Sequence, residues 1–320
     1  MADRDWRSAA RAPVGFVILV LLLATALSLG ARWSWFCDLF THFRPELTLG
    51  MALGSLLALA VRHRTLALLA LAGLVANALC LAWVVWPGPG VTVAGGRAVR
   101  VVSFNVAFFN RRFGEIAPWL ESLQADVIAL QELPARELPL VLAQMPDYPY
   151  QFLDANTGNY GVTVVSRWPL ADVRVVDLGV PDRNAAQVRV LIPGAPLTVT
   201  AVHLLWPLTP LSAGQRNRQM AALGAALANC RGACVALGDF NATRWSPHFQ
   251  QLLRDSGMRD CARGLFVPQT WPSWPIPLRI RIDQCLANGG VEVTGVAAGP
   301  DLGSDHLPTI NDLRIARPPG

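Results

Sequence analysis

Cys-Val-Ala-Leu-Gly-Asp-Phe-Asn at residues 234–241 is a short apolar run that turns polar at one end. Such a run predicts a buried strand, and Asp239 and Asn241 lie where that strand would end. A single Asp or Asn in this position is more often a turn or capping residue than a catalytic one. The interpretation therefore depends on what other predicted strand ends carry.

Polar residues recur at the ends of other predicted strands. They are Asn105 closing Val-Val-Ser-Phe-Asn, Glu132 after Asp-Val-Ile-Ala-Leu-Gln, His203 ending Thr-Val-Thr-Ala-Val-His, Asp283 in Arg-Ile-Asp, and Asp305 with His306 in Gly-Ser-Asp-His. Each alone has an ordinary structural explanation, but their joint occurrence does not. Loops at these strand ends can present the side chains to one cleft.

The region after residue 96 alternates short apolar runs with amphipathic stretches. We expect strands at 99–106, 126–130, 162–166, 186–192, 197–203, 234–237 and 279–286, with helices at 115–124 and 214–229. Alternation of this kind predicts an α/β fold in which helices cover the faces of sheets.

These segments resemble the motifs of the endonuclease/exonuclease/phosphatase family over about residues 97–315. Leu-Gln-Glu, Gly-Asp-Phe-Asn and Ser-Asp-His are moderate signals singly and a strong one in this order and spacing. The resemblance implies an α/β four-layer sandwich of two β-sheets flanked by helices, with the active site at one edge. It also implies a Mg²⁺-dependent hydrolase that acts on phosphoester bonds.

The resemblance further implies a metal site. Glu132 is expected to be the principal ligand, with Asn105 supporting it and Asp305 contributing, because Mg²⁺ takes hard oxygen ligands and keeps several waters. Mn²⁺ is expected to substitute for Mg²⁺. Family members often carry a second polar residue two positions after the first Asn, whereas Ala107 stands there in this chain. That departure puts a second metal in doubt.

The remaining motif residues are expected to be catalytic. Asp283 would hydrogen-bond His306 and fix its tautomer, which makes the pair a candidate general base. Asp239 would orient or deprotonate the attacking water, so His306 and Asp239 both remain candidates for the base. Asn241 and His203 would donate to phosphoryl oxygens and stabilise charge in the transition state.

The first 96 residues have the composition of a membrane region. They contain 7 Arg and 4 acidic residues, whereas residues 97–320 contain 20 Arg and 18 acidic residues, a net charge of +2. Apolar runs predict about three transmembrane helices, at 12–31, 47–61 and 65–86, followed by a Pro-Gly-Pro-Gly linker. We therefore expect an all-helical transmembrane region at 1–96 and a catalytic domain at 97–320.

The compartment of the catalytic domain depends on the run at 47–61, which is short for a span. Three Arg before residue 12 favour a cytoplasmic N-terminus, so three spans place the catalytic domain outside the cytoplasm and two leave it inside. We predict three spans, and hence a multi-pass protein of the cell membrane with an extracytoplasmic enzyme. The even number of Cys after residue 96 is consistent with this prediction.

Four Cys follow the membrane region: Cys230, Cys234, Cys261 and Cys285. In an oxidising compartment, Cys230 with Cys234 and Cys261 with Cys285 is one of three possible pairings. Four unpaired Cys packed as small apolar residues are the alternative.

The expected partners are a phosphoester substrate and a lipid bilayer, and the sequence indicates no protein partner. A nuclease-type phosphodiesterase is the leading prediction, although a net charge of +2 is small for a protein that grips many DNA phosphates. A lipid or inositol-type phosphoesterase is the alternative, and a non-catalytic membrane-bound binding module is the alternative of a different class. Trp206, Trp271 and Trp274 would either form a rim at the site or cap the core.

Overall fold

The computed structural model describes residues 2–86, 90–153, 161–265 and 267–316. The chain divides into two compact units. The first, here called the helical unit, is Met1–Trp86 with Trp245–Pro247. The second, here called the sandwich unit, is Pro87–Arg244 with His248–Gly320.

The helical unit is built from α1 (Ala2–Leu29), α2 (Trp35–Thr41), α3 (Arg44–Ala60) and α4 (Arg64–Val85). The three long helices share a small core that includes Ile18, Met51 and Ala70. Gly73 allows close packing there, because a Cβ at this position would lie 2.8 Å from Met51 Cε. Small residues at helix contacts are typical of membrane bundles, but they also occur elsewhere.

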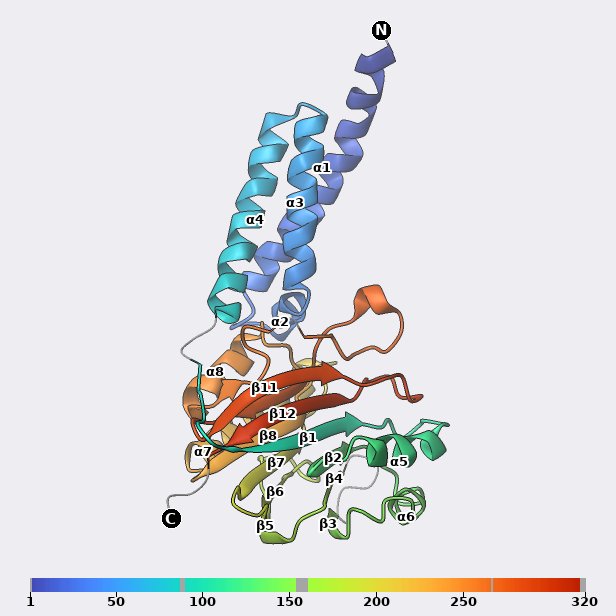
Figure 1. Cartoon of the computed structure of the whole chain (residues 1–320). Helices are drawn as coiled ribbons and strands as arrows, with labels where there is room; N and C mark the ends of the chain where they lie inside the picture. Colours follow the sequence, from blue (N-terminus) through green and yellow to red (C-terminus); the bar gives the residue numbers. More distant parts are fainter. Residues whose placement is uncertain (1, 87–89, 154–160, 266, 317–320) are drawn as a thin grey trace. The chain divides into compact units, whose positions relative to one another are not determined.

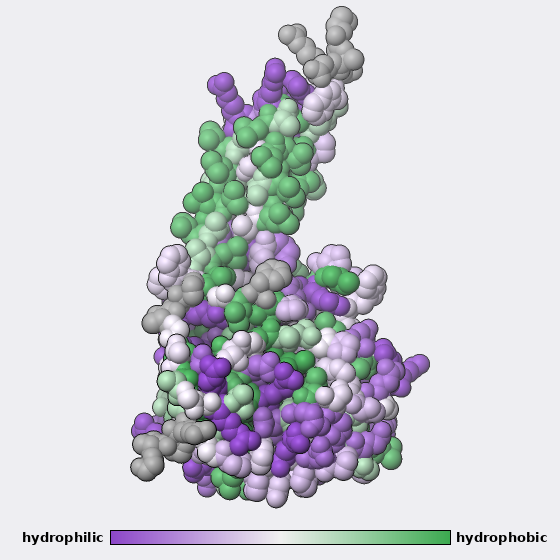
Figure 2. All heavy atoms as spheres, viewed as in Figure 1, coloured by the Kyte–Doolittle hydropathy of each residue, from purple (hydrophilic) through white to green (hydrophobic). Residues whose placement is uncertain are grey.

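The outside of the helical unit is apolar, as the green surface in Figure 2 shows. Phe16, Leu56 and Leu79 are 69%, 64% and 66% exposed. Within the described residues, two helices are long and apolar enough to cross a membrane, at Trp6–Leu29 and Arg64–Val85. The helix α3 contains all but the last residue of the predicted span 47–61, has 17 residues and is not one of these two.

The sandwich unit contains two six-stranded sheets (Figure 1). The first has the order β11-β12-β1-β2-β4-β3, with β1 Arg97–Asn105, β2 Val127–Gln131, β3 Tyr150–Leu153, β4 Val162–Ser166, β11 Val291–Ala298 and β12 Thr309–Ile315. The second has the order β5-β6-β7-β8-β10-β9, with β5 Leu170–Val176, β6 Ala185–Val190, β7 Leu197–His203, β8 Ala233–Asp239, β9 Arg259–Asp260 and β10 Asp283–Ala287.

The two sheets pack face to face over an apolar core that includes Val101, Val188 and Leu237. The outer face of the first sheet packs with α5 (Phe113–Ser122) and α6 (Leu138–Ala143), and that of the second with α7 (Pro210–Ala228) and α8 (Pro247–Ser256). The predicted four-layer sandwich of two sheets flanked by helices is therefore confirmed.

One predicted strand is shorter than expected. The run 279–286 forms a strand only from Asp283, because the residues before it belong to a loop whose arginines bind backbone carbonyls. Arg279 Nε donates to the Pro272 carbonyl at 3.1 Å, and Arg281 Nε donates to the Asp283 carbonyl at 3.1 Å. The apolar alternation of Ile280 and Ile282 therefore reflects burial in a loop.

The structure pairs the four Cys of the sandwich unit as Cys230 with Cys234 and Cys261 with Cys285. The first disulfide closes the connection between α7 and β8. The second links Cys261, directly after β9, to β10 beside it, where the Cys261 N–H also donates to the Cys285 carbonyl at 2.9 Å.

Gly238 determines how closely β7 approaches β8. It lies opposite Val202 in the parallel pairing and has a φ of +143°, and a Cβ there would lie 2.0 Å from the Val202 carbonyl oxygen. We predict that Gly238→Ala lowers the free energy of unfolding by at least about 2 kcal/mol, through overpacking and backbone strain. Chemical denaturation of the full chain in detergent, followed by tryptophan fluorescence, measures this effect.

Gly114→Ala is the matched control, because nothing lies within 4 Å of a Cβ at this position in α5. This variant should be unchanged or slightly more stable, by up to about 1 kcal/mol. Wild-type stability of Gly238→Ala would contradict the close approach of the two strands.

Candidate active site

The topology brings the candidate side chains to one edge of the sandwich. Asn105 is the last residue of β1 and Glu132 follows β2, which runs parallel to β1. His203 and Asp239 end the parallel strands β7 and β8, where they are register partners. Because parallel strands end at the same edge, each sheet contributes a pair of polar side chains.

Two further residues join this edge through antiparallel strands. Asp283 begins β10 directly opposite Asp239 in the pairing with β8. His306 lies three residues before β12, whose first residue, Thr309, pairs with Ser103 of β1. Strand ends from both sheets therefore meet at this edge, and the polar side chains that they carry are buried.

The Asn105 amide connects the two sheets. Its Nδ2 donates to Glu132 Oε1 at 3.0 Å and to Asp239 Oδ2 at 3.1 Å. These three side chains are 1%, 7% and 1% exposed. Glu132 Oε2 also accepts from the Phe108 N–H at 3.3 Å, and Glu132 itself has a φ of +58°, a conformation that non-glycine residues rarely adopt. Such conformations are common at functional sites.

Asp283 and His306 form a buried pair. His306 Nδ1 lies 3.0 Å from Asp283 Oδ2 and 3.2 Å from Oδ1, and Thr270 Oγ1 donates to Asp283 Oδ2 at 2.6 Å. These contacts hold the imidazole so that its other nitrogen, Nε2, lies 3.8 Å from Asp239 Oδ2. One ring nitrogen of His306 therefore contacts Asp283, and the other faces Asp239.

Asn241 and His203 complete the cluster in different ways. The Asn241 N–H donates to Asp239 Oδ1 at 2.8 Å, and its Nδ2 donates to the Leu204 carbonyl at 2.8 Å and to Asp239 Oδ2 at 3.2 Å. Both amide hydrogens of Asn241 are thus engaged within the protein. His203 Nε2 lies 3.4 Å from Glu132 Oε1 and 3.9 Å from Asp239 Oδ2.

The sequence pattern of the endonuclease/exonuclease/phosphatase family matches residues 102–306, which span all of these side chains. The chain belongs to this family. Members of the family hydrolyse phosphoester bonds with the help of divalent metals.

Solved structures of this family share the fold of the sandwich unit. D. rerio TDP2 complexed with a single-strand DNA product has 16% identity and a TM-score of 0.56, over 68% of this chain and 98% of that one. An endonuclease/exonuclease/phosphatase from Beutenbergia cavernae has 22% identity and a TM-score of 0.55, over 69% and 72%. Sphingomyelinase C from Streptomyces griseocarneus has 20% identity and a TM-score of 0.51, over 68% and 99%. A search of curated protein sequences found no match.

In this family member, Asp305 lies differently from the other candidate metal ligands. Its Oδ2 accepts from the Trp271 indole Nε1 at 3.0 Å. Its charge nevertheless acts on both Glu132 and His306. Among the described residues, Asp239, Asp283 and His306 each offer one ligand atom within 4.8 Å of the other two. The predicted ligand set of Asn105, Glu132 and Asp305 remains a prediction.

Several residues that support the site had no predicted role. Thr270 holds Asp283, and Ser304 Oγ donates to the Asn105 carbonyl at 2.7 Å and accepts from the His306 N–H at 3.0 Å. Arg216 is fully buried in α7 and its Nη1 donates to the Asn241 carbonyl at 3.0 Å. Arg216 lies at helical spacing among the apolar residues of α7 that face the core. A charged residue on an apolar helix face is unusual, so the sequence could have indicated that Arg216 has a buried partner.

The three tryptophans flanking the motifs have separate roles. Trp271 binds Asp305 and lies beside His306, with ring centroids 6.4 Å apart. Trp206 lies under the Arg183 guanidinium at 5.6 Å. Trp274 is 76% exposed, so it does not cap the core.

Burial perturbs the ionisation of the cluster. It raises the pKa of Asp239 to about 7, an effect that His306 opposes and Asp283 increases. Burial likewise raises the pKa of Glu132, although the hydrogen bond from Asn105 lowers it in part. For His306, burial lowers the pKa, but the carboxylates of Asp283, Asp239 and Asp305 outweigh it and raise the pKa to about 10. At neutral pH the imidazole is therefore protonated.

These residues fit a hard divalent cation. Glu132 and Asp239 are buried carboxylates held together by a neutral amide, and burial raises the pKa of both more than the charge of His306 lowers it. Such a pair attracts either protons or a cation, and oxygen donors suit Mg²⁺ and Mn²⁺. Glu132 and Asp239, with the Asn105 amide oxygen nearby, are the residues that would hold the ion.

Cation binding should strengthen as pH rises. The folded-state pKa of Asp239 is about 7 against an ordinary 3.8, so metal-free stability should fall as pH rises from about 4 to 7. A cation that needs the ionised carboxylates regains this stability, and its dissociation constant should rise about tenfold for each pH unit below 7. We predict that Mg²⁺ raises the melting temperature of the full chain more at pH 8 than at pH 5.5.

Differential scanning fluorimetry in detergent, with and without MgCl₂, measures this difference. In Glu132→Gln the Mg²⁺-dependent increase at pH 8 should be lost. Equal shifts at both pH values would show that Mg²⁺ stabilises the chain at a site other than this cluster.

Proposed function

We propose that this chain is a membrane-anchored phosphodiesterase that uses a divalent cation, with Mg²⁺ the first candidate and Mn²⁺ a substitute. The observation that carries the proposal is the bridge from Asn105 Nδ2 to Glu132 and Asp239, at 3.0 and 3.1 Å. Beside that bridge, the Asp283-bound His306 lies 3.8 Å from Asp239. One buried cluster thus combines paired carboxylates with a proton donor.

The proposed roles follow from protonation states and hydrogen bonds. A bound cation would polarise the phosphoryl group and lower the pKa of a water. Asp239 would orient that water and accept its proton through a carboxylate oxygen that does not bind the cation. Its pKa of about 7 describes the site before the cation binds, and the cation would lower it. His306, held protonated by Asp283, would donate to a phosphoryl or leaving oxygen. This favours Asp239 over His306 as the base in the resting site.

The other two catalytic candidates have separate proposed roles. His203 would donate to the phosphoryl group, which stabilises charge as it develops. Asn241 acts as a positioning residue, because both of its amide hydrogens are used on Asp239 and Leu204. The sequence suggested that Asn241 donates to the phosphate, and the observed contacts favour the positioning role instead.

Two substrate classes remain candidates. A nucleic acid is the leading one, supported by the fold shared with a TDP2 that was solved with a single-strand DNA product. A phospholipid is the second, supported by exposed apolar side chains on loops that adjoin the catalytic strand ends. Phe109, Leu208 and Trp274 are 55%, 71% and 76% exposed. Parallel assays with single-stranded DNA and with sphingomyelin vesicles separate the two classes.

We predict that Glu132→Gln, Asp239→Asn and His306→Ala each lower turnover of bis(p-nitrophenyl) phosphate by at least about a hundredfold, because each removes a cation ligand or a proton-transfer group. EDTA should abolish activity, and Mg²⁺ or Mn²⁺ should restore it. Asp255→Asn, on the exposed side of α8, is the matched control and should keep wild-type activity. Full activity in EDTA, or in His306→Ala, would overturn the assignment.

The anchor and compartment are part of the proposal. The exposed apolar surface of the helical unit supports insertion in a bilayer. Two disulfides in the sandwich unit support an oxidising, extracytoplasmic location. This combination requires α3, at 17 residues, to cross with α1 and α4, helped by Arg62 and Arg64 reaching the interface.

Alkaline phosphatase, which is active only outside the cytoplasm, tests this topology. Fused after Gly96 it should be active in cells, and fused after Arg64 it should be silent. An inactive fusion at Gly96, with the fusion protein expressed, would place the enzyme in the cytoplasm and make α3 an interfacial or re-entrant segment.

A further inference from the structure

A pocket lies at the edge of the sandwich opposite the catalytic cluster. It has a volume of about 930 Å³, and its lining includes Thr198 near the start of β7 and Ala233 at the start of β8. His203 and Asp239 close the other ends of these two strands. At a rise of about 3.3 Å per residue, the two sites are separated by roughly 17–20 Å along the strands.

Three arginines, Arg174, Arg189 and Arg231, line this pocket with a single carboxylate, that of Asp172. Asp172 Oδ2 lies 3.6 Å from Arg189 Nη1. Among the described residues, neither Arg174 nor Arg231 has a carboxylate partner. Among the described residues, the lining of this pocket therefore carries more positive than negative charge.

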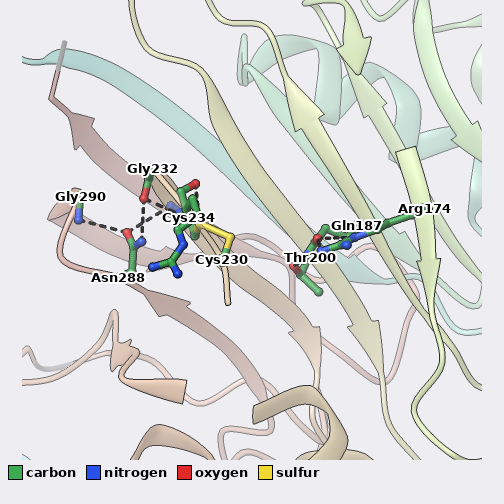
Figure 3. Close-up of a disulfide and its surroundings, with 9 residues drawn as sticks. Arg174, Gln187, Thr200, Cys230, Gly232, Cys234, Asn288 and Gly290 are labelled. Carbon is green, nitrogen blue, oxygen red and sulfur yellow. Dashed lines mark hydrogen bonds between the residues drawn. A yellow bond between two sulfur atoms is a disulfide. The ribbon is translucent and has the colours of Figure 1, made fainter. Parts of the chain in front are cut away.

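The Arg174 guanidinium is held in place by a hydrogen bond to Gln187 on the neighbouring strand β6. Its Nε donates to Gln187 Oε1 at 2.7 Å, and Gln187 Nε2 donates in turn to Thr200 Oγ1 at 2.8 Å. Gln187 is only 4% exposed, so the exposed Arg174 side chain is hydrogen-bonded to a buried partner, and the three side chains lie across β5, β6 and β7 (Figure 3). Ordering a long side chain in advance lowers the entropy lost when a ligand binds.

The segment that carries Arg231 is held in place on the other side of the pocket. The Cys230–Cys234 disulfide closes it, and Asn288 Nδ2 donates to the Gly232 carbonyl at 2.7 Å (Figure 3). Asn288 Oδ1 accepts from the Cys234 N–H and the Gly290 N–H, each at 3.1 Å. The loop 230–234 is therefore a closed and anchored turn.

We propose that this pocket binds a phosphate-bearing ligand at a site distinct from the catalytic cluster. Guanidinium groups recognise phosphate through paired N–H donors, and two of those present have no competing carboxylate. The volume is larger than one phosphate requires and matches a small organic ligand. A soluble phosphorylated compound and a phospholipid headgroup share this chemistry, and both are within the proposal.

Isothermal titration of the full chain in detergent with inorganic pyrophosphate, in EDTA, tests the site. EDTA removes the divalent cation that would attract an anion to the catalytic cluster, and the Asp239→Asn variant below reports any binding that remains there. Arg174→Gln combined with Arg231→Gln should raise the dissociation constant at least about tenfold, because two charge-assisted contacts are lost. Arg136→Gln is the matched control, because Arg136 is 74% exposed outside the pocket, and it should bind as wild type does.

Two further variants make the result specific. Asp239→Asn should retain pyrophosphate binding, which separates this site from the proposed catalysis. Cys230→Ser with Cys234→Ser should bind more weakly although both arginines remain, because loop 230–234 is no longer closed. Absence of binding, or equal binding by the double arginine variant, would overturn the proposal, and unchanged binding by the serine variant would overturn the role of the disulfide.

Competition identifies the source of the phosphate. Dihexanoyl phosphatidic acid, used below its micelle concentration, should displace pyrophosphate at lower concentration than glycerol 3-phosphate does if the site takes lipid headgroups. The reverse order identifies a soluble ligand. Failure of both compounds to displace pyrophosphate would contradict a site for organic phosphates.

Discussion

The bridge from the Asn105 amide to Glu132 and Asp239 is the contact on which the candidate site depends. Two buried carboxylates from different sheets would repel each other if both were charged. One neutral amide nevertheless donates to both, with Asn105 Nδ2 at 3.0 Å from Glu132 Oε1 and 3.1 Å from Asp239 Oδ2. Because the energy of a buried charge is high, this arrangement favours binding either protons or a cation. Burial raises the pKa of Asp239 for the same reason, because without a cation the buried carboxylate is stabilised by binding a proton.

The surrounding fold positions the residues that make this contact. Parallel pairing of β1 with β2 and of β7 with β8 delivers the polar residues to one edge, and the close approach at Gly238 sets the spacing of the second pair. At the opposite edge, β7 and β8 begin beside an arginine-lined pocket. The sandwich thus separates the proposed cation site from the proposed phosphate site, with the apolar core between them.

The sequence predicted the architecture, and the polar residues that it singled out at strand ends lie together at one edge, because such residues stand out against apolar runs. Their roles remain predictions. The sequence did not predict Thr270, which reaches Asp283 from a loop 13 residues earlier in the chain, since no periodic pattern marks such a contact. Edge strands such as β5 were also missed, because they are largely exposed and lack a buried face. The contacts of Asn241 and Asp305 could not be predicted either, because side-chain hydrogen bonds depend on tertiary packing.

Isotope labelling tests the proposed chemistry most directly. The full chain in detergent would be incubated with bis(p-nitrophenyl) phosphate and Mg²⁺ in H₂¹⁸O, and both products would be analysed by mass spectrometry. Attack of a water oriented by Asp239 on phosphorus predicts one ¹⁸O atom in each p-nitrophenyl phosphate and none in p-nitrophenol. Label in the p-nitrophenol, or no product at all, would contradict a phosphodiesterase built on this cluster.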